Sequence, residues 1–200
     1  MSLEGFASYE ILLASASPRR QALMGELGIP FRVVESGHMD EEYPSGLKGA
    51  EIATYLAEHK SEAYGTDLDK GQILLTADTV VCFRDRELGK PLSRQDAVEM
   101  IRLLSGNTHQ VYTGVCLRSW WSRNVFFACT DVSFSNLENW EIEWYVDQFR
   151  PFDKAGAYGI QEWIGHVAVE KIEGSYFNVM GLPVQKVYSE LKRIVKADKK

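Results

Sequence analysis

The run Ile11-Leu12-Leu13-Ala14-Ser15-Ala16-Ser17-Pro18-Arg19-Arg20 joins an apolar strand directly to the start of a helix. Its first four residues are typical of a short buried strand. Ser17 and Pro18 stand where the N-cap and the first residue of a helix are expected, because a serine hydroxyl caps free N–H groups and proline is tolerated at that position. The run therefore predicts a strand, a tight turn and a helix in direct succession.

The turn in this run suits a multiply charged anion. The unpaired N–H groups and the positive dipole end of a helix face whatever lies beyond the strand. The hydroxyls of Ser15 and Ser17 and the guanidinium groups of Arg19 and Arg20 converge on the same place, as phosphate recognition requires. The run alone leaves a second interpretation open, namely an ordinary capped helix with two solvated arginines.

Helical and strand patterns alternate in the first half of the chain, and long hairpins fill the middle. Apolar runs predict further strands at 31–34, 73–83, 108–121, 125–134 and 166–172. Helical periodicity predicts helices that include 52–64, 97–104, 142–149 and 187–195, and Ser93 with Asp96 and Ser135 with Glu138 resemble capping boxes for the middle two. This order favours a single α/β domain, residues 1–200, with a mixed β-sheet and helices packed around it. A doubly wound Rossmann unit is disfavoured because its G-x-G-x-x-G turn is missing.

The composition restricts the partners and the location of the chain. Lys and Arg number 22 against 28 Asp and Glu, and this net charge of −6 argues against a nucleic-acid polymer as partner. No run approaches the ~18 apolar residues of a membrane span, and the first eight residues lack the pattern of a signal peptide. Cys82, Cys116 and Cys129 lie in apolar, strand-like runs without close pair spacing, which predicts reduced core residues and a cytoplasmic protein.

Asp78 is the most informative single position for chemistry. It lies within the apolar run 73–83, where an unpaired charge would be costly to bury. The carboxylate must therefore be hydrogen-bonded, paired with a cation or bound to a metal. A purely structural aspartate at the end of a strand is the alternative, and the neighbouring hydroxyls of Thr76 and Thr79 favour the functional interpretation.

A second group of hard oxygen ligands follows at Asp40-Glu41-Glu42. Together with Asp78 and substrate phosphates, this loop could hold Mg²⁺ or Mn²⁺, which favour a few carboxylates plus phosphate oxygens. Taken alone, an acidic triplet is more often a solvated loop. The four histidines show no ligand spacing for zinc, and no G-x-S-x-G turn indicates a serine hydrolase.

Three further side chains could contact a nucleotide. Lys90 lies in the turn Gly89-Lys90-Pro91 and Lys60 late in the helix at 52–64, although a lone lysine is more often a surface residue. Gln161 follows a loop of small residues that lets a ligand approach the backbone. Its amide offers one donor and one acceptor, which matches the O4 and N3–H edge of uracil or thymine; a flipped amide suits cytosine as well.

Seven short motifs, taken in order, resemble the Maf family of nucleoside triphosphate pyrophosphatases over nearly the whole chain. Each motif is weak alone, and their succession is specific. The motifs are Ser15 to Arg20, Asp40-Glu41, Ala77-Asp78-Thr79, Gly89-Lys90-Pro91, Leu104 to His109, Asp153 to Gln161 and Gly181-Leu182-Pro183.

The resemblance implies a fold, an activity and a set of site residues. The implied fold is like that of inosine triphosphatase, an elongated mixed sheet with a cleft between two lobes, often as a homodimer. The implied reaction is the hydrolysis of a nucleoside triphosphate to the monophosphate and pyrophosphate with a divalent cation. By position, Asp78 corresponds to the proton acceptor. The phosphate and metal site falls on Ser15, Arg19, Glu41, Lys60 and Lys90, and Arg20, Thr79 and Gln161 match the subgroup that acts on dTTP and UTP.

Two other functions are compatible with the same family. The first is 7-methyl-GTP pyrophosphatase activity, against which Arg20, Thr79 and Gln161 argue. The second is a nucleotide-binding regulator of cell division, against which the presence of Asp78, Glu41 and Lys90 argues, since a pure binder would tolerate the loss of the base. The sequence therefore favours an enzyme that uses Mg²⁺ or Mn²⁺ and a pyrimidine nucleoside triphosphate.

Overall fold

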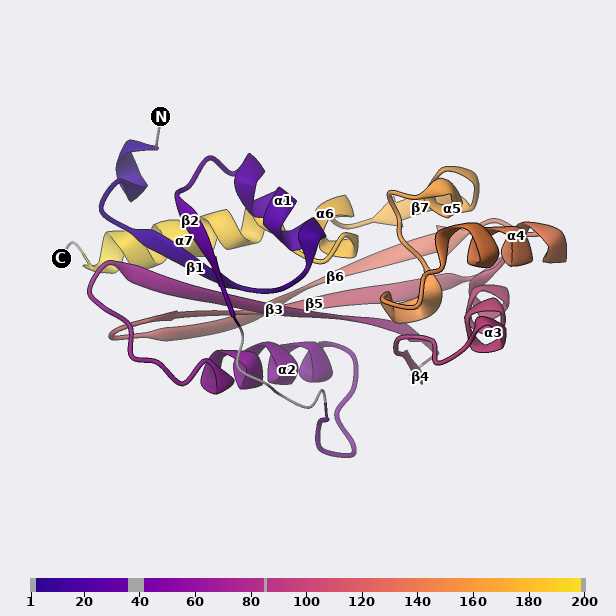
Figure 1. The fold of residues 1–200 in the computed structure, drawn as a ribbon, viewed down its shortest axis with the longest axis horizontal. Coiled ribbons are helices and arrows are strands. Elements are labelled where there is room, and N and C mark those ends of the chain that lie inside the picture. The colour runs from indigo at the N-terminus through magenta and orange to yellow at the C-terminus, as the bar shows by residue number, and fades with distance from the viewer. Residues whose placement is uncertain (1–2, 36–41, 85, 199–200) are drawn as a thin grey trace.

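The computed structural model describes residues 3–35, 42–84 and 86–198, drawn in colour in Figure 1. A sheet of seven strands forms its centre, in the order β2-β1-β3-β5-β6-β7 with β4 paired to β3. The strands are β1 (Glu10–Ala14), β2 (Phe31–Val34), β3 (Gln72–Phe83), β4 (Arg86–Leu88), β5 (Thr108–Ser119), β6 (Arg123–Phe134) and β7 (Val169–Glu173). The helices are η1 (Glu4–Phe6), α1 (Pro18–Glu26), α2 (Ala50–Ala63), α3 (Arg94–Leu104), α4 (Asn139–Phe149), η2 (Ala155–Ala157), α5 (Trp163–Val167), α6 (Tyr176–Val179) and α7 (Val184–Asp198).

The sheet is mixed, as predicted. β1 runs parallel to β2 and β3, because the helical crossovers α1 and α2 connect these strands, and the remaining pairs are antiparallel. The long strands β3, β5 and β6 give the molecule its elongated form in Figure 1. The predicted elongated α/β sheet with flanking helices is confirmed.

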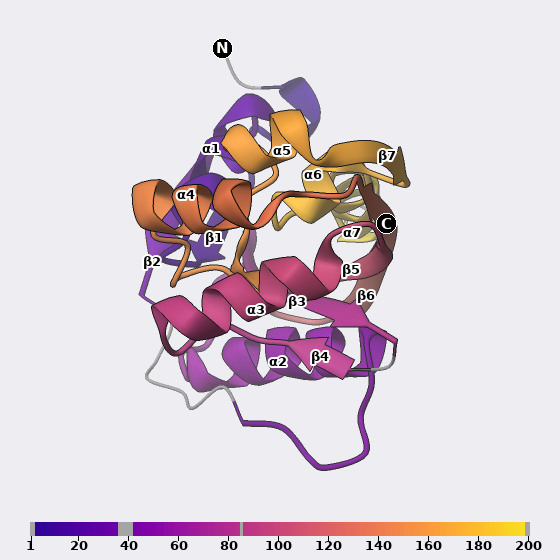
Figure 2. The same cartoon turned by 90° about the vertical axis from the view of Figure 1, so that its right-hand side faces the viewer.

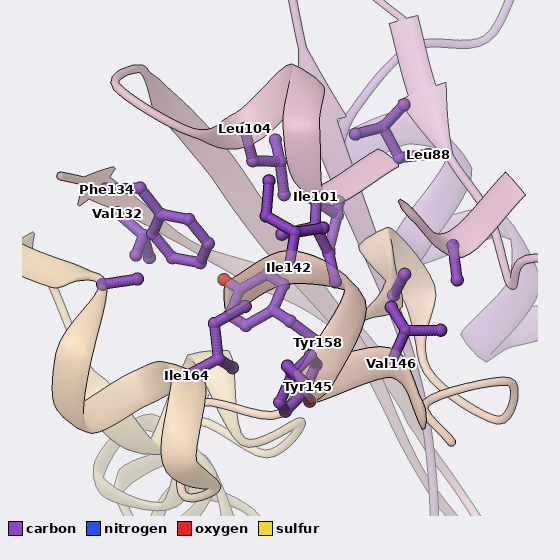
Figure 3. Packing of buried hydrophobic residues seen from close by; sticks show 14 of the residues in the cluster. Leu88, Ile101, Leu104, Val132, Phe134, Ile142, Tyr145, Val146, Tyr158 and Ile164 are labelled. Carbon is purple, nitrogen blue, oxygen red and sulfur yellow. The ribbon is translucent and has the colours of Figure 1, made fainter. Parts of the chain in front are cut away.

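Helices cover both faces of the sheet, and two separate cores lie on one of these faces. Figure 2 shows α2 on one side and α1, α4, α5 and α7 on the other. One core joins α1 and α7 to β1 and to the first half of β3. The second joins α3, α4 and α5 to the far end of β3, and in it the rings of Tyr158 and Phe134 pack edge to face with centroids 5.0 Å apart (Figure 3). The space between the two cores lies over the middle of β3.

The middle of β3 has a free edge. β1 pairs with β3 only as far as Leu13 opposite Leu75, and β4 begins to pair at Val81 opposite Leu88. Between these two contacts, the segment 76–80 pairs on its other side with β5, and no strand in the described part of the chain covers its open side. Because β1 ends early and β4 is short, this gap leaves room for a ligand beside Asp78 and Thr79.

Four local predictions were wrong. The helix expected to begin at Ser135 is capped instead by Glu138 with Glu141, since the Ser135 hydroxyl bonds to the carbonyls of Val167 and Ala168. The strand expected at 166–172 begins later, because α5 occupies Trp163–Val167 before β7.

The remaining corrections concern a cysteine and a cap. Cys82 and Cys116 are buried, but Cys129 is exposed, because it lines a surface pocket together with Gly49, Tyr112 and Phe127. Ser93 caps α3 through the N–H of Asp96, as predicted. The Asp96 carboxylate accepts instead from the N–H of Leu92, so the capping box is incomplete.

Candidate active site

A cavity of about 720 Å³ opens at the free edge of β3. It is bounded by the end of β1, the start of α1, the last turns of α2, the segment after β4, the loop that contains η2, and the segment between α6 and α7. Eight residues expected at the site from the sequence line it, namely Ser15, Arg19, Arg20, Lys60, Asp78, Thr79, Lys90 and Gln161. The ninth, Glu41, lies outside the described residues.

The turn before α1 is built as its sequence predicts. Ser17 has extended backbone angles, and its hydroxyl accepts a hydrogen bond from the Arg20 N–H, with Pro18 as the first helical residue. The buried Ser15 hydroxyl accepts from the N–H of Ser17 at 3.3 Å, which tightens the turn. The remaining N–H groups and the positive dipole end of α1 face the cavity, so this wall suits an anion.

The two adjacent arginines point to different parts of the cavity. Arg19 reaches toward the η2 loop, where its Nη1 lies 3.6 Å from the Asp153 carboxylate. Arg20 instead donates from Nε to the Gly181 carbonyl at 2.7 Å and from Nη2 to the Thr79 hydroxyl at 3.0 Å. Arg19 can therefore meet a charged group in the cavity, whereas Arg20 fixes the wall that carries Thr79.

Asp78 forms an ion pair with Lys60 of α2. Residues alternate across β3, so that Asp78 faces α2 while Thr79 faces the opposite side. The side chains of Asp78 and Lys60 are only 12% and 16% exposed, and the pairing explains how a carboxylate can lie in an apolar strand. The Thr76 hydroxyl donates to the Ala57 carbonyl at 2.6 Å, which anchors α2 one turn before Lys60.

α2 reaches this position because of a glycine in β5. A Cβ on Gly114 would lie 2.2 Å from the carbonyl oxygen of Ala53, which is far inside van der Waals contact. Only a residue without a side chain allows the backbone of α2 to lie so close to the sheet. The approach of α2 therefore sets the distance at which Lys60 meets Asp78.

The loop that carries Gln161 is fixed by a polar network that sequence reasoning missed. Lys154 donates from Nζ to Asp153 at 2.7 Å and lies 3.1 Å from the Glu162 carboxylate. The hydroxyl of the buried Tyr145 donates to Glu162 and accepts from the Gly159 N–H at 3.1 Å. Burial, followed by the bond to Glu162, raises the pKa of Tyr145, so its hydroxyl stays protonated. Tyr145 looked like an apolar core position in the helical pattern, which is why its polar role could not be found.

The same loop is joined to the segment that precedes Lys90. The N–H of Gly156 donates to the Gly89 carbonyl at 3.1 Å, and Gly156 has a φ of 69°, which favours glycine. A side chain at Gly156 would also meet Val81 at 3.0 Å. This contact holds Lys90 and the η2 loop together on the far side of the cavity from α1.

The oxygen donors of the cavity are compatible with a hard divalent cation shared with phosphates. Its described carboxylates are Asp78, paired with Lys60, Glu87, which accepts from the Tyr43 hydroxyl, and Asp153. Among described residues, no group of three or more His, Cys, Asp or Glu could form a dedicated metal site. Mg²⁺ is usually bound by one or two carboxylates together with substrate phosphates, and this donor set fits that arrangement.

Comparisons with known proteins identify close relatives. The family model described as "Maf-like protein" matches residues 10–194. A protein of Bacteroides fragilis named "dTTP/UTP pyrophosphatase" is 53% identical over 188 residues, which cover 93% of this chain and 96% of the relative. Relatives with the same name in Bacteroides thetaiotaomicron and Porphyromonas gingivalis are 50% and 46% identical, over 93% and 95% of this chain and 96% of each relative. The Ham1 protein structure from Staphylococcus aureus matches with a TM-score of 0.43 and 12% identity, over 94% of this chain and 99% of that one. In the described residues, no helix is both long and apolar enough to cross a membrane.

Proposed function

Because this chain belongs to the Maf family, we propose that it hydrolyses dTTP and UTP to the nucleoside monophosphate and pyrophosphate. The observation that supports this proposal best is that one cavity gathers a helix N-terminus, several cations and a buried carboxylate. Its volume of about 720 Å³ suits a ligand of nucleotide size. The relatives at 46–53% identity carry the name of this activity.

The triphosphate binds along the side of the cavity that the N-terminus of α1 forms. The N–H groups of α1, the Ser15 hydroxyl and the Arg19 guanidinium donate to phosphate oxygens, and Lys90 approaches from the other side. These groups stabilise the negative charge that develops on the departing pyrophosphate. Asp153 competes with phosphate for Arg19, so Arg19 exchanges one anionic partner for another when substrate binds.

Asp78 accepts a proton from the attacking water. The Lys60 ammonium is paired with the Asp78 carboxylate and lies beside the phosphates as a further cation. Asp78, and by family resemblance Glu41, would hold a divalent cation such as Mg²⁺ or Mn²⁺, which when bound polarises phosphoryl oxygens. Arg20, Thr79 and Gln161 form the part of the cavity that contacts the base.

A panel of substrates tests the proposal. Purified protein is incubated with dTTP, UTP, CTP and 7-methyl-GTP in Mg²⁺ or Mn²⁺, and the phosphate product is identified. We expect turnover of dTTP and UTP with release of pyrophosphate. Preference for 7-methyl-GTP would favour the other activity known in the family, and tight binding without turnover would favour a regulator. The homodimer and the cytoplasmic location belong to the same proposal, and light scattering tests the dimer.

A further inference from the structure

A buried hydroxyl lies directly behind Thr79. Thr113 of β5 stands opposite Thr79 of β3 in the sheet, and their hydroxyl oxygens are 2.9 Å apart. Thr79 lines the cavity, whereas Thr113 is completely buried. Thr113 therefore cannot touch a substrate, and any effect that it has on binding must pass through Thr79.

The neighbours of the two threonines fix the direction of their hydrogen bonds. A hydroxyl has one proton to donate, and Thr113 Oγ1 lies 3.0 Å from the backbone carbonyl of Asn178, which can only accept. Thr113 thus has only lone pairs left for Thr79, so Thr79 must donate to Thr113. On its other side, Thr79 accepts from Nη2 of Arg20, because a guanidinium group can only donate.

The end of this chain of hydrogen bonds is immobile. The Asn178 side chain is buried, and its Nδ2 donates to the Val111 carbonyl at 2.9 Å and to the Thr130 hydroxyl at 3.0 Å. The Asn178 carbonyl also accepts from the Gly181 N–H at 3.0 Å. Since this carbonyl cannot turn away or become a donor, the direction of the chain cannot reverse.

We propose that Thr113 is a positioning residue that makes Thr79 an obligate hydrogen-bond acceptor toward the base. The proton of Thr79 is used by Thr113 and one of its lone pairs by Arg20, which leaves a single lone pair for a ligand. The Thr79 hydroxyl oxygen therefore selects a base whose ring nitrogen carries a hydrogen and rejects a base whose ring nitrogen carries a lone pair. This inference rests on the proposed function and explains its preference for uracil and thymine.

The distinction separates uracil from cytosine at one atom. Uracil and thymine carry a hydrogen on N3, which Thr79 can accept, whereas N3 of cytosine is itself an acceptor and would repel the Thr79 lone pair. Gln161 alone cannot make this distinction. In the described part of the chain no hydrogen bond holds its side-chain amide, which can turn over to suit either base. Thr79 supplies the fixed acceptor that Gln161 lacks.

The test removes only the hydroxyl of Thr113. In Thr113→Val, the proton of Thr79 becomes available to a ligand, so Thr79 can donate to N3 of cytosine. We expect the ratio of kcat/KM for UTP to that for CTP to fall by about tenfold, the value of one hydrogen bond gained by the wrong base. The change appears mainly as a lower KM for CTP, with kcat for UTP within about threefold of the wild type, since the phosphate contacts are untouched.

Two further variants separate the hydroxyl from packing. Thr113→Ser keeps the hydroxyl and should keep the wild-type ratio of kcat/KM for UTP to that for CTP. Thr113→Ala removes the hydroxyl and should lower this ratio as the valine variant does. The serine and alanine variants differ from each other only by the hydroxyl, so this pair decides the matter even if the valine variant fails to fold. The Asn178 carbonyl keeps its bond from Gly181 in all three.

The outcomes distinguish this inference from the proposed function. An unchanged UTP to CTP ratio in the alanine and valine variants, or an equal loss of both activities, would refute the role of Thr113. A serine variant as unselective as the alanine variant would refute it also. If the wild type turns over no triphosphate, the proposed function fails, and the role of Thr113 is then judged by the ratio of dissociation constants for UTP and CTP in the same variants.

Discussion

Replacing Gly114 by alanine should move α2 away from the sheet. The new Cβ would lie 2.2 Å from the Ala53 carbonyl oxygen and 2.5 Å from the Thr54 nitrogen, and both are backbone atoms that no rotamer change can shift. An ordinary van der Waals contact begins near 3.4 Å, so α2 must retreat by about 1 Å. Forced overpacking of this kind costs about 1–3 kcal/mol.

The displacement should also reach the chemistry. Lys60 lies in the last turn of α2, and it moves with the helix away from Asp78, which stays on β3. A misplacement of about 1 Å can cost about a hundredfold in rate. We therefore expect Gly114→Ala to lower kcat/KM for UTP by that order and to lower Tm by about 3–10 °C in a chain of this size.

Thermal unfolding and UTP turnover are measured together on Gly114→Ala and on a matched control. Gly25→Ala lies inside α1, where nothing is within 4 Å of the new Cβ, and it should stabilise the protein by about 0.5–1 kcal/mol because alanine favours a helix. A Gly114→Ala variant with wild-type Tm and turnover would refute the reasoning that this glycine sets the position of α2. A loss of Tm without a loss of turnover would refute only the link to Lys60.

Three other predictions follow from single contacts. Asp78→Asn should lower kcat by about 10²–10⁴-fold, and it should also lower Tm because it leaves the largely buried Lys60 without its carboxylate, whereas the same substitution at the exposed Asp69 should leave turnover unchanged. Burial lowers the pKa of His109 from 6.5 to about 4 in the folded protein. The imidazole of His109 therefore binds a proton more tightly in the unfolded chain than in the folded protein. The free energy of unfolding should then fall by up to about 3 kcal/mol as the pH drops from 6.5 to 4. When the free energy of unfolding is measured in urea at a series of pH values, His109→Gln should make this fall between pH 6.5 and 4 less steep. An equally steep fall in the variant would show that other groups cause the pH dependence. Tyr145→Phe loses the bonds to Glu162 and Gly159 and should lower the free energy of urea unfolding by about 1–3 kcal/mol. An unchanged urea midpoint would contradict the structural role of this hydroxyl.

Much of the fold could be predicted because the signals are local. The cap at Ser17 followed by Pro18 acts within one turn of helix, and the start of α1 agrees with it. The apolar run of β3 and the periodicity of α7 likewise require no knowledge of the rest of the chain. The wrong prediction at Ser135 has a tertiary cause, since α5 offers its hydroxyl carbonyl partners that a helix cap cannot match.

The residues behind the site could not be found from the sequence. Tyr145 and Thr113 lie in apolar patterns and read as ordinary core positions, and only their neighbours give them polar roles. Gly114 carries no local signal of turn or cap, and its need for a bare Cα appears only when α2 packs on it. The residues of the cavity wall could be proposed from motifs, but the residues that hold them in place, such as Tyr145, Thr113 and Gly114, could not.

By itself the sequence determined the strand, turn and helix at Ile11 to Arg20, the charge that Asp78 must have compensated, and a list of residues that could meet an anion. Only the tertiary structure decided which cation compensates Asp78, and which partners Arg19 and Arg20 each contact. Lys60 is 18 residues from Asp78, and Arg20 is 161 residues from its carbonyl partner at Gly181. Such contacts depend on the register of strands and on the approach of helices to the sheet, which are set by packing across the whole chain rather than by neighbouring residues.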